Sequence, residues 1–510
     1  MPHETTIPPR RRAPAASRRR EEHVPVVIVG AGPAGLATAT MLARHGVASL
    51  LVERRLVPSD RPRATGISAR SMEILRSWGL EDDARAGAPD VEWLAWHGHT
   101  LADLDGGSTI AVGHPTREQF RMLTPAPPAC QSQQHIEPLL ETHLRDLRVA
   151  RIERGTVLES AVQDADGILR VTVRDAEGAA RTVRAEYLVG ADGIRSTVRR
   201  ELGIPASPPD HSGHRIGVQF RAPELWALLG DRRFVLYVSD HPEGAGTLIP
   251  SGRDDRWVYV RVWDPAQEDL ASYSEERALR LIRLAAGQPA LEPRIDGIVA
   301  VTFTSRIAQR FREGRGFLVG DAAHQATPRG GTGLNAALQD GFDLGWRLAW
   351  TLRDWAGADL LDGYEAERRP LVESTVSRSA DPDWTGPEPL RMALADLGGR
   401  IPHAWLPGAA GRTSTLDLLG AGLTLFTGPA REDWDAALAR VRPQVPVHVR
   451  GLDPVTARAL GIRDGGALLA RPDGNPVAAW APGTDATAAL FAGIAAATSR
   501  APEFPAALAA

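Results

Sequence analysis

Residues 24–53 read VPVVIVGAGPAGLATATMLARHGVASLLVE, and this stretch decides the expected fold. Residues 24–29 form an apolar run, as in a strand buried on both faces of a parallel sheet. They lead into three glycines at G-x-G-x-x-G spacing, and then into apolar residues at helical spacing that end at Gly46. A second apolar strand ends in Glu53. This order of strand, glycine turn, helix, strand and acid predicts a dinucleotide-binding βαβ unit.

Each feature of this unit has a physical role toward a dinucleotide. The glycines permit a tight turn, close approach of a pyrophosphate to the helix N-terminus, and close packing of helix on strand. The acid at the end of the second strand accepts hydrogen bonds from ribose hydroxyls. The pattern does not distinguish NAD(P) from FAD. It assigns ligand contacts to Gly30, Gly32, Pro33, Ala34, Gly35 and Glu53.

Two further glycine turns follow apolar strands. Residues 185–200 read AEYLVGADGIRSTVRR, in which Asp192 and Gly193 separate a strand from an arginine-rich helix start. Asp-Gly is also common in an ordinary type I turn. Residues 316–324 read GFLVGDAAH and repeat the arrangement around Asp321.

The segment from 320 to 335, GDAAHQATPRGGTGLN, is dense in glycine. Taken alone, such a turn either reverses the chain or exposes backbone NH groups as an anion cradle. From 333 to 357, apolar residues at three- and four-residue spacing predict one amphipathic helix that ends at Gly357.

Composition limits the classes of function. A chain of 510 residues is too long for one core, so two or three domains are expected. A formal net charge of −4, with arginines spread along the chain, gives no reason to expect a nucleic-acid partner. The chain contains no lysine, which excludes a lysine Schiff base and a P-loop. Cys130 is the only cysteine, so no disulfide or thiolate metal cluster can form within the chain, no metal site is predicted, and a cytoplasmic location is expected.

The N-terminus is treated separately from the domains. Residues 1–22 carry two arginine triplets among Pro, Ala and Ser, and we expect a disordered extension, with a targeting or acidic-surface arm as the alternative. They lack the apolar core of a secretory signal. No uninterrupted apolar run elsewhere is long enough to span a bilayer, so no membrane association is expected.

The three glycine motifs, in this order, resemble the class A flavoprotein monooxygenases, the p-hydroxybenzoate-hydroxylase-like family. Further matches are RPRATG at 61–66, SQQHIEPLL at 132–140 and YEAERRPL at 364–371. The resemblance covers residues 24–380 and implies that the ligand is FAD, bound non-covalently, with NADPH or NADH as a transient reductant. It also implies an α/β fold with a Rossmann-like FAD domain of the glutathione-reductase type.

The resemblance also implies roles for single residues. Glu53 binds the adenosine ribose, and Arg63 the pyrophosphate. Gln133 contacts the ribityl region, as does Asp321, while Asp192 serves both FAD and NAD(P)H. The full cofactor set is Gly30, Gly32, Pro33, Ala34, Gly35, Glu53, Arg54, Arg63, Gln133, Asp192, Gly193, Gly320, Asp321, Pro328, Gly331, Gly333, Leu334 and Asn335.

One of these roles has its own physical basis. Leu334 and Asn335 would offer backbone NH groups to the N1–C2=O edge of the flavin at a helix N-terminus. Reduced flavin is negative at N1, and the positive end of a helix dipole stabilises that charge.

Three residues are expected where substrate meets flavin: Thr327, Pro328 and Arg329. The family often has two prolines before the glycine turn, and here the first is replaced by Thr327. Pro328 retains a carbonyl that faces substrate in some relatives. Arg329 either favours an anionic substrate or points to solvent.

Alternating polar and apolar residues predict an antiparallel sheet between 208 and 263. It resembles the family's substrate-covering sheet, with Phe220, Leu236 and Leu248 expected on the inner face. An apolar lining suits a planar aromatic substrate, although the same positions would also build an ordinary core.

The alanine-rich tail resembles the thioredoxin-like C-terminal domain of phenol and aromatic-polyketide hydroxylases. It has no C-x-x-C, so it is expected to be structural or an oligomer surface. A Pro-rich linker is expected at 379–389. The expected domains are an FAD domain (24–92, 129–205 and 298–382), a substrate domain (93–128 and 206–297) and the tail (396–510).

The resemblance implies an NAD(P)H-consuming monooxygenase that hydroxylates a phenolic or polycyclic, polyketide-like aromatic through a flavin C4a-hydroperoxide. Its partners would be this substrate and O2, and the chain would be a monomer or homodimer. His324 is expected to pack beside the cofactor, and the sequence does not identify a catalytic base among His97, His99 and His114. The alternatives are Baeyer–Villiger oxygenation of a polyketide ketone, FAD-dependent reduction and a silent flavoprotein. A flavin halogenase is disfavoured because its lysine is absent.

Overall fold

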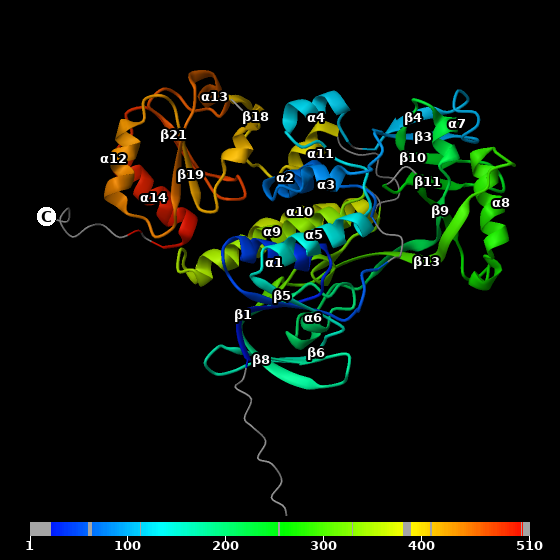
Figure 1. The fold of residues 1–510 in the computed structure, drawn as a ribbon, viewed down its shortest axis with the longest axis horizontal. Coiled ribbons are helices and arrows are strands. Elements are labelled where there is room, and N and C mark those ends of the chain that lie inside the picture. The colour runs from blue at the N-terminus through cyan, green and yellow to red at the C-terminus, as the bar shows by residue number, and fades with distance from the viewer. Residues whose placement is uncertain are drawn as a thin grey trace, which may run out of the picture.

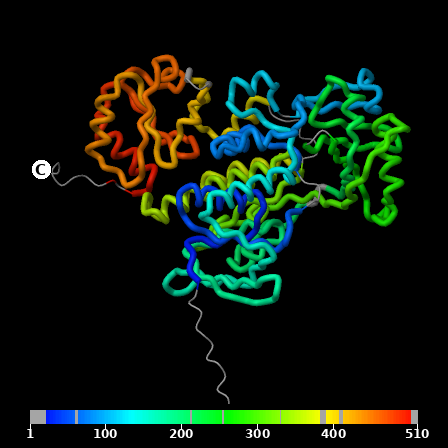
Figure 2. The backbone as a smooth tube through the Cα atoms, viewed as in Figure 1, coloured from blue at the N-terminus to red at the C-terminus, as the bar shows by residue number. Residues whose placement is uncertain are grey.

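We describe the fold from a computed structural model, which places residues 22–59, 64–112, 114–252, 255–328, 330–380, 389–408, 411–500 and 502. The predictions for residues 1–21, Arg63, Arg329 and most of the linker, 381–388, lie outside these described residues. Figure 1 shows a central α/β body with an antiparallel sheet at one end and the C-terminal unit at the other. The tube in Figure 2 shows that the central body combines N-terminal segments with segments near residue 340.

The central sheet contains the predicted βαβ unit. Its first strand lies between two parallel neighbours, with Val26 opposite both Ser49 and Tyr187. Two further strands join this sheet: β7 (Leu169–Arg174) pairs antiparallel with β8, and β6 (Val157–Gln163) pairs antiparallel with β7. The strand order is β14 (Arg312–Glu313), β15 (Gly316–Leu318), β8 (Ala180–Gly190), β1 (Glu22–Val29), β2 (Ser49–Glu53) and β5 (Ala150–Arg154).

Four helices lie together beside the central sheet in Figure 1: α1 (Pro33–Arg44), α5 (Gln133–Asp146), α9 (Gly333–Leu352) and α10 (Asp362–Ala380). Helices α1 and α9 pack closely, since a Cβ on Gly341 would lie 2.2 Å from the carbonyl oxygen of Ala34. The predicted end of α9 at Gly357 is wrong, because the helix stops at Leu352 and Asp354 adopts a left-handed φ of 59°. The chain then continues through η3 (Ala358–Leu361).

The second sheet has the order β16 (His324–Gln325), β13 (Arg294–Ile307), β9 (Asp210–Arg221), β12 (Arg256–Trp263), β11 (Gly246–Pro250), β10 (Phe234–Ser239), β3 (Glu92–Gly98) and β4 (Ser108–Ala111). All neighbours are antiparallel except β10 and β3. Helices α7 (Glu224–Leu229) and α8 (Glu275–Ala286) contribute to a core with the strands, and η1 (Leu270–Ser272) precedes α8.

The prediction that Phe220, Leu236 and Leu248 share one face of this sheet is wrong. Leu248 lies opposite Tyr237, so its side chain is on the face of Tyr237 and not on that of Leu236. Phe220 and Leu248 are fully buried in the core that includes α8, whereas Leu236 is half-buried on the other face. Alternation reveals that a strand has two faces, but not which of them a helix covers.

The C-terminal unit is a four-stranded sheet in the order β20 (Val447–Gly451), β19 (Leu423–Thr427), β21 (Ala467–Ala470) and β22 (Pro476–Trp480). The first two strands are parallel and β21 is antiparallel to its neighbours. Together with α12 (Glu432–Val441), α13 (Pro454–Ala459) and α14 (Ala486–Thr498), this βαβ–ββα order is that of a thioredoxin-like fold. The ribbon of β17 (Trp405–Gly408) and β18 (Gly411–Ser414), followed by η4 (Thr415–Leu418), precedes it.

Short helices fill the space between the C-terminal unit and the second sheet in Figure 1: α2 (Ala69–Ser77), α3 (Glu81–Arg85), α4 (Arg117–Leu123) and α11 (Pro389–Asp396). The remaining helices are α6 (Thr197–Glu201) and η2 (Gly320–Ala322). No helix in the described part of the chain is both long and apolar enough to cross a bilayer. The domain boundaries expected from the sequence stay predictions.

Candidate functional site

The three predicted glycine turns meet beyond the carboxyl ends of β1, β8 and β15. Gly30 has a φ of 109°, and a Cβ there would lie 2.3 Å from the carbonyl oxygen of Ala191. A Cβ on Gly320 would lie 3.1 Å from the Cβ of Ala34 and 3.0 Å from that of Ala337. Turns that are far apart in the sequence therefore pack against one another.

Gly32 is a glycine that the protein's own packing does not require. It caps α1 with φ −82° and ψ −177°, an extended conformation that any residue can adopt. A Cβ on Gly32 would meet no heavy atom within 4 Å, and the same holds for Gly333 at the start of α9. Bare backbone at two helix N-termini suits the close approach of an anionic ligand, so these residues fit the phosphates and the N1 edge of FAD.

Glu53 is hydrogen-bonded to the first glycine turn. Its Oε2 accepts a hydrogen bond from the backbone NH of Ala31 at 2.8 Å, and its Oε1 accepts one from that of Arg55 at 2.9 Å. The carboxylate is thereby fixed at the end of β2, where a ribose would lie in a dinucleotide fold. Arg54 is exposed beside it.

Gln133 and Asp192 are both held by protein groups. Gln133 begins α5, and its Nε2 donates to Oε1 of Glu137 at 2.6 Å. The Asp192 carboxylate accepts from the backbone NH groups of Thr197 and Val198 at 2.6 and 3.0 Å, at the start of α6. In this structure, therefore, Asp192 stabilises a helix N-terminus, while Gly193 next to it has a left-handed φ of 78°.

The side chain of Asn335 joins two loops at the start of α9. Its Nδ2 donates to the carbonyl oxygens of Gly66 at 3.0 Å and Gly331 at 2.8 Å, and its Oδ1 accepts from the NH of Ser68 at 2.8 Å. The first backbone hydrogen bond of the helix comes from the NH of Ala336. The NH groups of residues 333–335 precede that bond, so they do not point at a carbonyl of their own helix.

The three residues expected at the substrate differ in their surroundings. Thr327 is buried, and its hydroxyl donates to the carbonyl oxygen of Ser379 at 2.5 Å. That hydroxyl therefore holds the turn against α10. Pro328 is exposed, and its carbonyl accepts from the NH of Gly331 at 3.0 Å. Arg329 lies outside the described residues.

A buried charged cluster lies directly beneath the third turn. Asp340 is fully buried, and its Oδ2 contacts Nε2 of His324 at 2.5 Å and the NH of Gly320 at 3.0 Å. Its Oδ1 accepts from Nε of Arg368 at 2.8 Å. Burial acts to raise the pKa of Asp340, but the adjacent His324 and Arg368 lower it to about 2.

Asp340 and Arg368 were not among the residues predicted from the sequence. The signal was present, because Asp340 lies near Ala337 and Leu344 on the buried side of an amphipathic helix. An acid at such a position requires a partner. His324 was expected beside the cofactor, and it holds Asp340 at the base of that turn.

The sheet face that carries Leu236 points toward the expected FAD domain. Gln219 on this face donates to Oε1 of Gln134 in α5 at 3.2 Å. Trp93 of β3 lies 3.5 Å from the position of a Cβ on Gly66, next to the Asn335 hydrogen bonds. The neighbours on this face are mostly apolar and half-buried: Leu236, Val238, Thr247, Ile249 and Val260.

The three unassigned histidines lie in different places. His97 is half-buried and His99 exposed, both beside Asp240, with ring nitrogens 4.0 and 3.4 Å from its carboxylate. His114 packs against Trp93 with ring centroids 4.9 Å apart, and burial lowers its pKa to about 4. His114 is therefore neutral at physiological pH.

One group of three carboxylates in the described residues has metal-ligand spacing: Asp343, Glu367 and Asp473. Arg347 pairs with Asp343 at 3.0 Å and with Glu367 at 2.8 Å. Arg471 pairs with Glu367 and with Asp473, each at 2.6 Å. These carboxylates therefore form a network with arginine between the C-terminal unit and helices α9 and α10.

Two protein-family models match the chain. The model described as FAD binding domain matches residues 23–379. The model described as aromatic-ring hydroxylase, C-terminal, matches residues 395–501. Together they cover the central body, the second sheet and the C-terminal unit.

Individual proteins are similar over nearly the whole chain. Aklavinone 12-hydroxylase RdmE of Streptomyces purpurascens is 37% identical over 514 residues, covering 90% of this chain and 95% of that protein. Tetracenomycin A2 monooxygenase-dioxygenase of Streptomyces glaucescens is 34% identical over 534 residues, covering 89% and 92%. A solved ternary complex of aklavinone-11 hydroxylase with FAD and aklavinone has a TM-score of 0.84 and 32% identity, covering 94% of this chain and 100% of that one.

Proposed function

Because the chain belongs to the FAD-dependent aromatic-ring hydroxylases, a family of flavoprotein monooxygenases, we propose that its substrate is a polycyclic aromatic polyketide. The enzyme is a flavin-dependent aromatic monooxygenase that uses NAD(P)H. Relatives at 34–37% identity are named for reactions on aklavinone and tetracenomycin A2. The observation that carries the proposal is the apolar sheet face around Leu236, opposite the glycine turns. A face with few polar groups suits a large planar ring system.

The three glycine turns and the start of α9 together are called the flavin bed, or bed, below. We assign the residues of this bed to parts of FAD. The start of α1, at Gly32, receives the pyrophosphate, and Glu53 the adenosine ribose. Asp321 and Gln133 hold the ribityl chain, and the NH groups at the start of α9 receive the N1 edge of the ring. When bound and reduced by NAD(P)H, FAD supplies the activation of O2 for transfer of one oxygen atom to the ring of the substrate.

The protein's own residues orient the substrate, exclude water and stabilise charge. The half-buried apolar face around Leu236 orients the ring system and keeps water away from the flavin edge. The dipole of α9 favours negative charge at its N-terminus. Thr327 and Asp340 hold the turn between them from two sides, through Ser379 and through the NH of Gly320.

The decisive experiment is a substrate screen with the purified FAD-loaded enzyme. Phenols and naphthacene-type polyketides, with and without a ring ketone, would be compared for stimulated NAD(P)H oxidation under 18O2. We expect the polycyclic compounds to stimulate oxidation and to gain one labelled oxygen on an aromatic carbon. A lactone or ester product would instead establish Baeyer–Villiger oxygenation, and NAD(P)H oxidation without label in any product would contradict the proposal.

Asp321→Ala should weaken FAD binding. A lost charge-assisted hydrogen bond to the ribityl chain costs about 1.5–3 kcal/mol, or roughly 10- to 100-fold in Kd. The measurement is fluorescence titration of the apoprotein with FAD. Asp435→Ala, an exposed acid of α12 in the C-terminal unit, is the control and should leave the Kd unchanged. Equal Kd values for both variants would remove Asp321 from the site.

The two faces of the substrate sheet should respond differently to substitution. Leu236→Phe would occupy substrate space and raise KM for a polycyclic substrate by roughly tenfold, with little change in stability. Phe220→Leu lies in the closed core, so it should cost about 1–2 kcal/mol of unfolding free energy and leave KM unchanged. Steady-state kinetics and urea unfolding of both variants check this, and the reverse pattern would mean that the substrate face is assigned to the wrong side.

We also propose that the enzyme works in the cytoplasm, as a monomer or homodimer. The buried single thiol of Cys130 and the need for NAD(P)H support this location. Sedimentation of the FAD-loaded protein would determine the oligomeric state.

A further inference from the structure

The segment that follows α10 contacts helix α2 at three points along its length. Asp396 lies at the first turn of the helix, where it accepts from the NH of Arg70. Arg400 pairs with Glu73 at its middle, at 2.6 Å. Asp417 accepts from Nε and Nη2 of Arg76 in its last turn, both at 2.8 Å. The C-terminal part of the chain therefore holds α2 at its beginning, middle and end.

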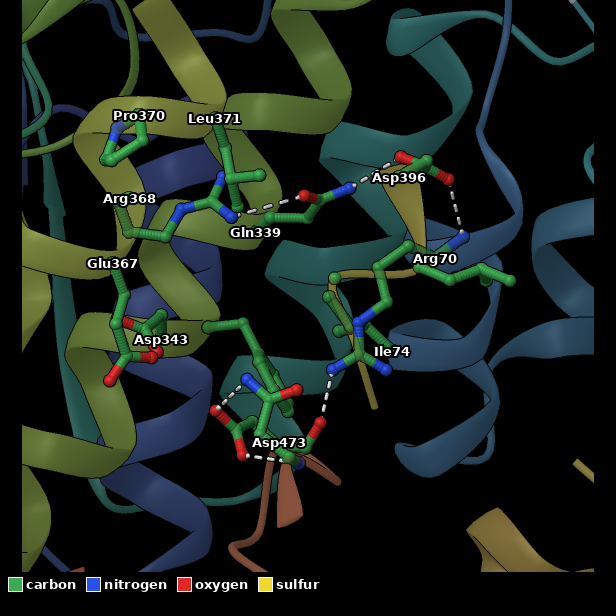
Figure 3. A pocket seen from close by; sticks show the side chains of 14 residues that line it. Arg70, Ile74, Gln339, Asp343, Glu367, Arg368, Pro370, Leu371, Asp396 and Asp473 are labelled. Carbon is green, nitrogen blue, oxygen red and sulfur yellow. Dashed lines mark hydrogen bonds between the residues drawn. The ribbon is translucent and has the colours of Figure 1, made fainter. Parts of the chain in front are cut away.

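The contact at the beginning differs from the other two because three neutral donors converge on one carboxylate. Oδ1 of Asp396 accepts from Oγ of Ser68 and from Nε2 of Gln339, each at 3.0 Å. Its Oδ2 accepts from the NH of Arg70 at 3.1 Å. Figure 3 shows the bonds of Asp396 to Gln339 and Arg70 on the wall of a cavity of about 320 Å³ between α2, α9, α10 and the C-terminal unit. The carboxylate is also placed at the positive end of α2.

These donors connect Asp396 to the bed at the start of α9. Ser68 is the N-cap of α2, and its NH donates to Oδ1 of Asn335. Asn335 in turn holds the carbonyl oxygens of Gly66 and Gly331, the loops on either side of the helix start. Gln339 is on α9 itself, one turn after Asn335. Asp396 is thus linked to the start of α9 by a hydrogen-bonded route through Ser68, and to the helix itself by its bond to Gln339.

We propose that Asp396 is a positioning residue for the flavin ring, acting from the C-terminal segment through Ser68 and Gln339. This inference rests on the proposed placement of the ring at the start of α9. Asp396 fixes Ser68, Ser68 orients Asn335, and Asn335 sets the spacing between the loops at Gly66 and Gly331. The C-terminal segment thereby adjusts the cofactor site without touching the cofactor.

Asp396→Asn is the sharpest probe, because it preserves size and changes only the acceptors. An amide has one oxygen, so its NH2 group must face either the NH of Arg70 or the donors Ser68 and Gln339. We expect the Kd for FAD to rise by about tenfold, since part of a charge-assisted network is lost at a distance from the ligand. We also expect a shift in the flavin absorption spectrum and a larger share of NAD(P)H oxidised without product.

Asp417→Asn is the matched control, because it weakens the contact between the same C-terminal segment and the far end of α2. It should lower thermal stability to a similar degree and leave the Kd for FAD and the flavin spectrum as in the wild type. Ser68→Ala is the second, milder variant, which removes the hydroxyl link but retains the NH that donates to Asn335. Its effect on Kd should not add to that of Asp396→Asn, whereas it should add to any effect of Asp417→Asn.

The outcomes separate this inference from the proposed function. Wild-type apoprotein that fails to bind FAD would contradict the proposed function itself. Normal FAD binding and spectrum in both Asp396→Asn and Ser68→Ala would overturn the positioning role alone. Equal losses of FAD affinity in Asp396→Asn and Asp417→Asn would also overturn it, because general loosening of α2 would then explain both. If Asp396→Asn does not fold, Ser68→Ala against Asp417→Asn decides the question.

Discussion

Asp340→Asn should lower the free energy of unfolding by about 3–5 kcal/mol, because it leaves the buried guanidinium of Arg368 without its counter-charge. Asp340 is fully buried and holds His324, Arg368 and the NH of Gly320 together. The variant should also bind FAD more weakly, since the turn at Gly320 loses its anchor. Urea unfolding of apoprotein and FAD titration measure the two effects.

The size of the effect should depend on pH in a defined direction. The pKa of Asp340 is lowered from 3.8 to about 2 in the folded protein, so its contribution to stability is present above pH 4 and declines as pH falls toward 2. The difference between wild type and Asp340→Asn should shrink over that interval. Glu373→Gln, which removes an exposed ion pair with Arg369 on α10, is the control and should cost less than about 1 kcal/mol. An equally small loss for Asp340→Asn would show that the cluster is not a support of the turn.

Gly32→Val should abolish FAD binding while the fold survives. The added side chain meets no protein atom at its Cβ and suits the extended backbone at this position, so only the weaker helix cap costs stability, by about 1 kcal/mol or less. The same atoms would occupy the path of the pyrophosphate toward the helix N-terminus, so we expect at least a roughly hundredfold loss of FAD affinity. The measurement is FAD titration of apoprotein, with circular dichroism to verify the fold.

Gly35→Ala is the companion variant with the opposite expectation. A Cβ on Gly35 would lie 1.9 Å from the carbonyl oxygen of Gly30, so this glycine is required by packing between α1 and the turn. The variant should therefore have a lower free energy of unfolding even as apoprotein, without FAD. Tight FAD binding by Gly32→Val would mean that the cofactor does not approach this helix N-terminus.

The parts of the molecule that local sequence patterns determine were predictable. The strand before Gly30, the helix after Pro33 and the strand that ends at Glu53 follow from buried runs, helical spacing and glycine positions within a short segment. The thioredoxin-like tail was expected from its resemblance to the tail domain of phenol and aromatic-polyketide hydroxylases, and the observed order of strands and helices agrees with it. Family membership followed because the three glycine motifs are specific when they occur in this order.

The parts that depend on contacts between distant segments were not predictable. Alternation along β9, β10 and β11 could not show that Phe220 and Leu248 face helices while Leu236 faces the other way. The partner of Asp340 lies 28 positions away on α10, and that of Asp396 lies 328 positions away at Ser68. No spacing rule within one helix reveals such pairs, although a buried acid on an apolar face signals that some partner exists.

The meeting of three distant turns has a consequence for biosynthesis. The bed combines the turn at Gly32 with the start of α9 at Gly333, so a nascent chain that has not yet extended past α9 lacks one whole side of it. On the proposed placement of FAD, cofactor loading would therefore be a late event, after the N-terminal βαβ unit has left the ribosome. Once loaded, a ligand that contacts all three turns favours the native state over the unfolded one and joins the early and late parts of the chain.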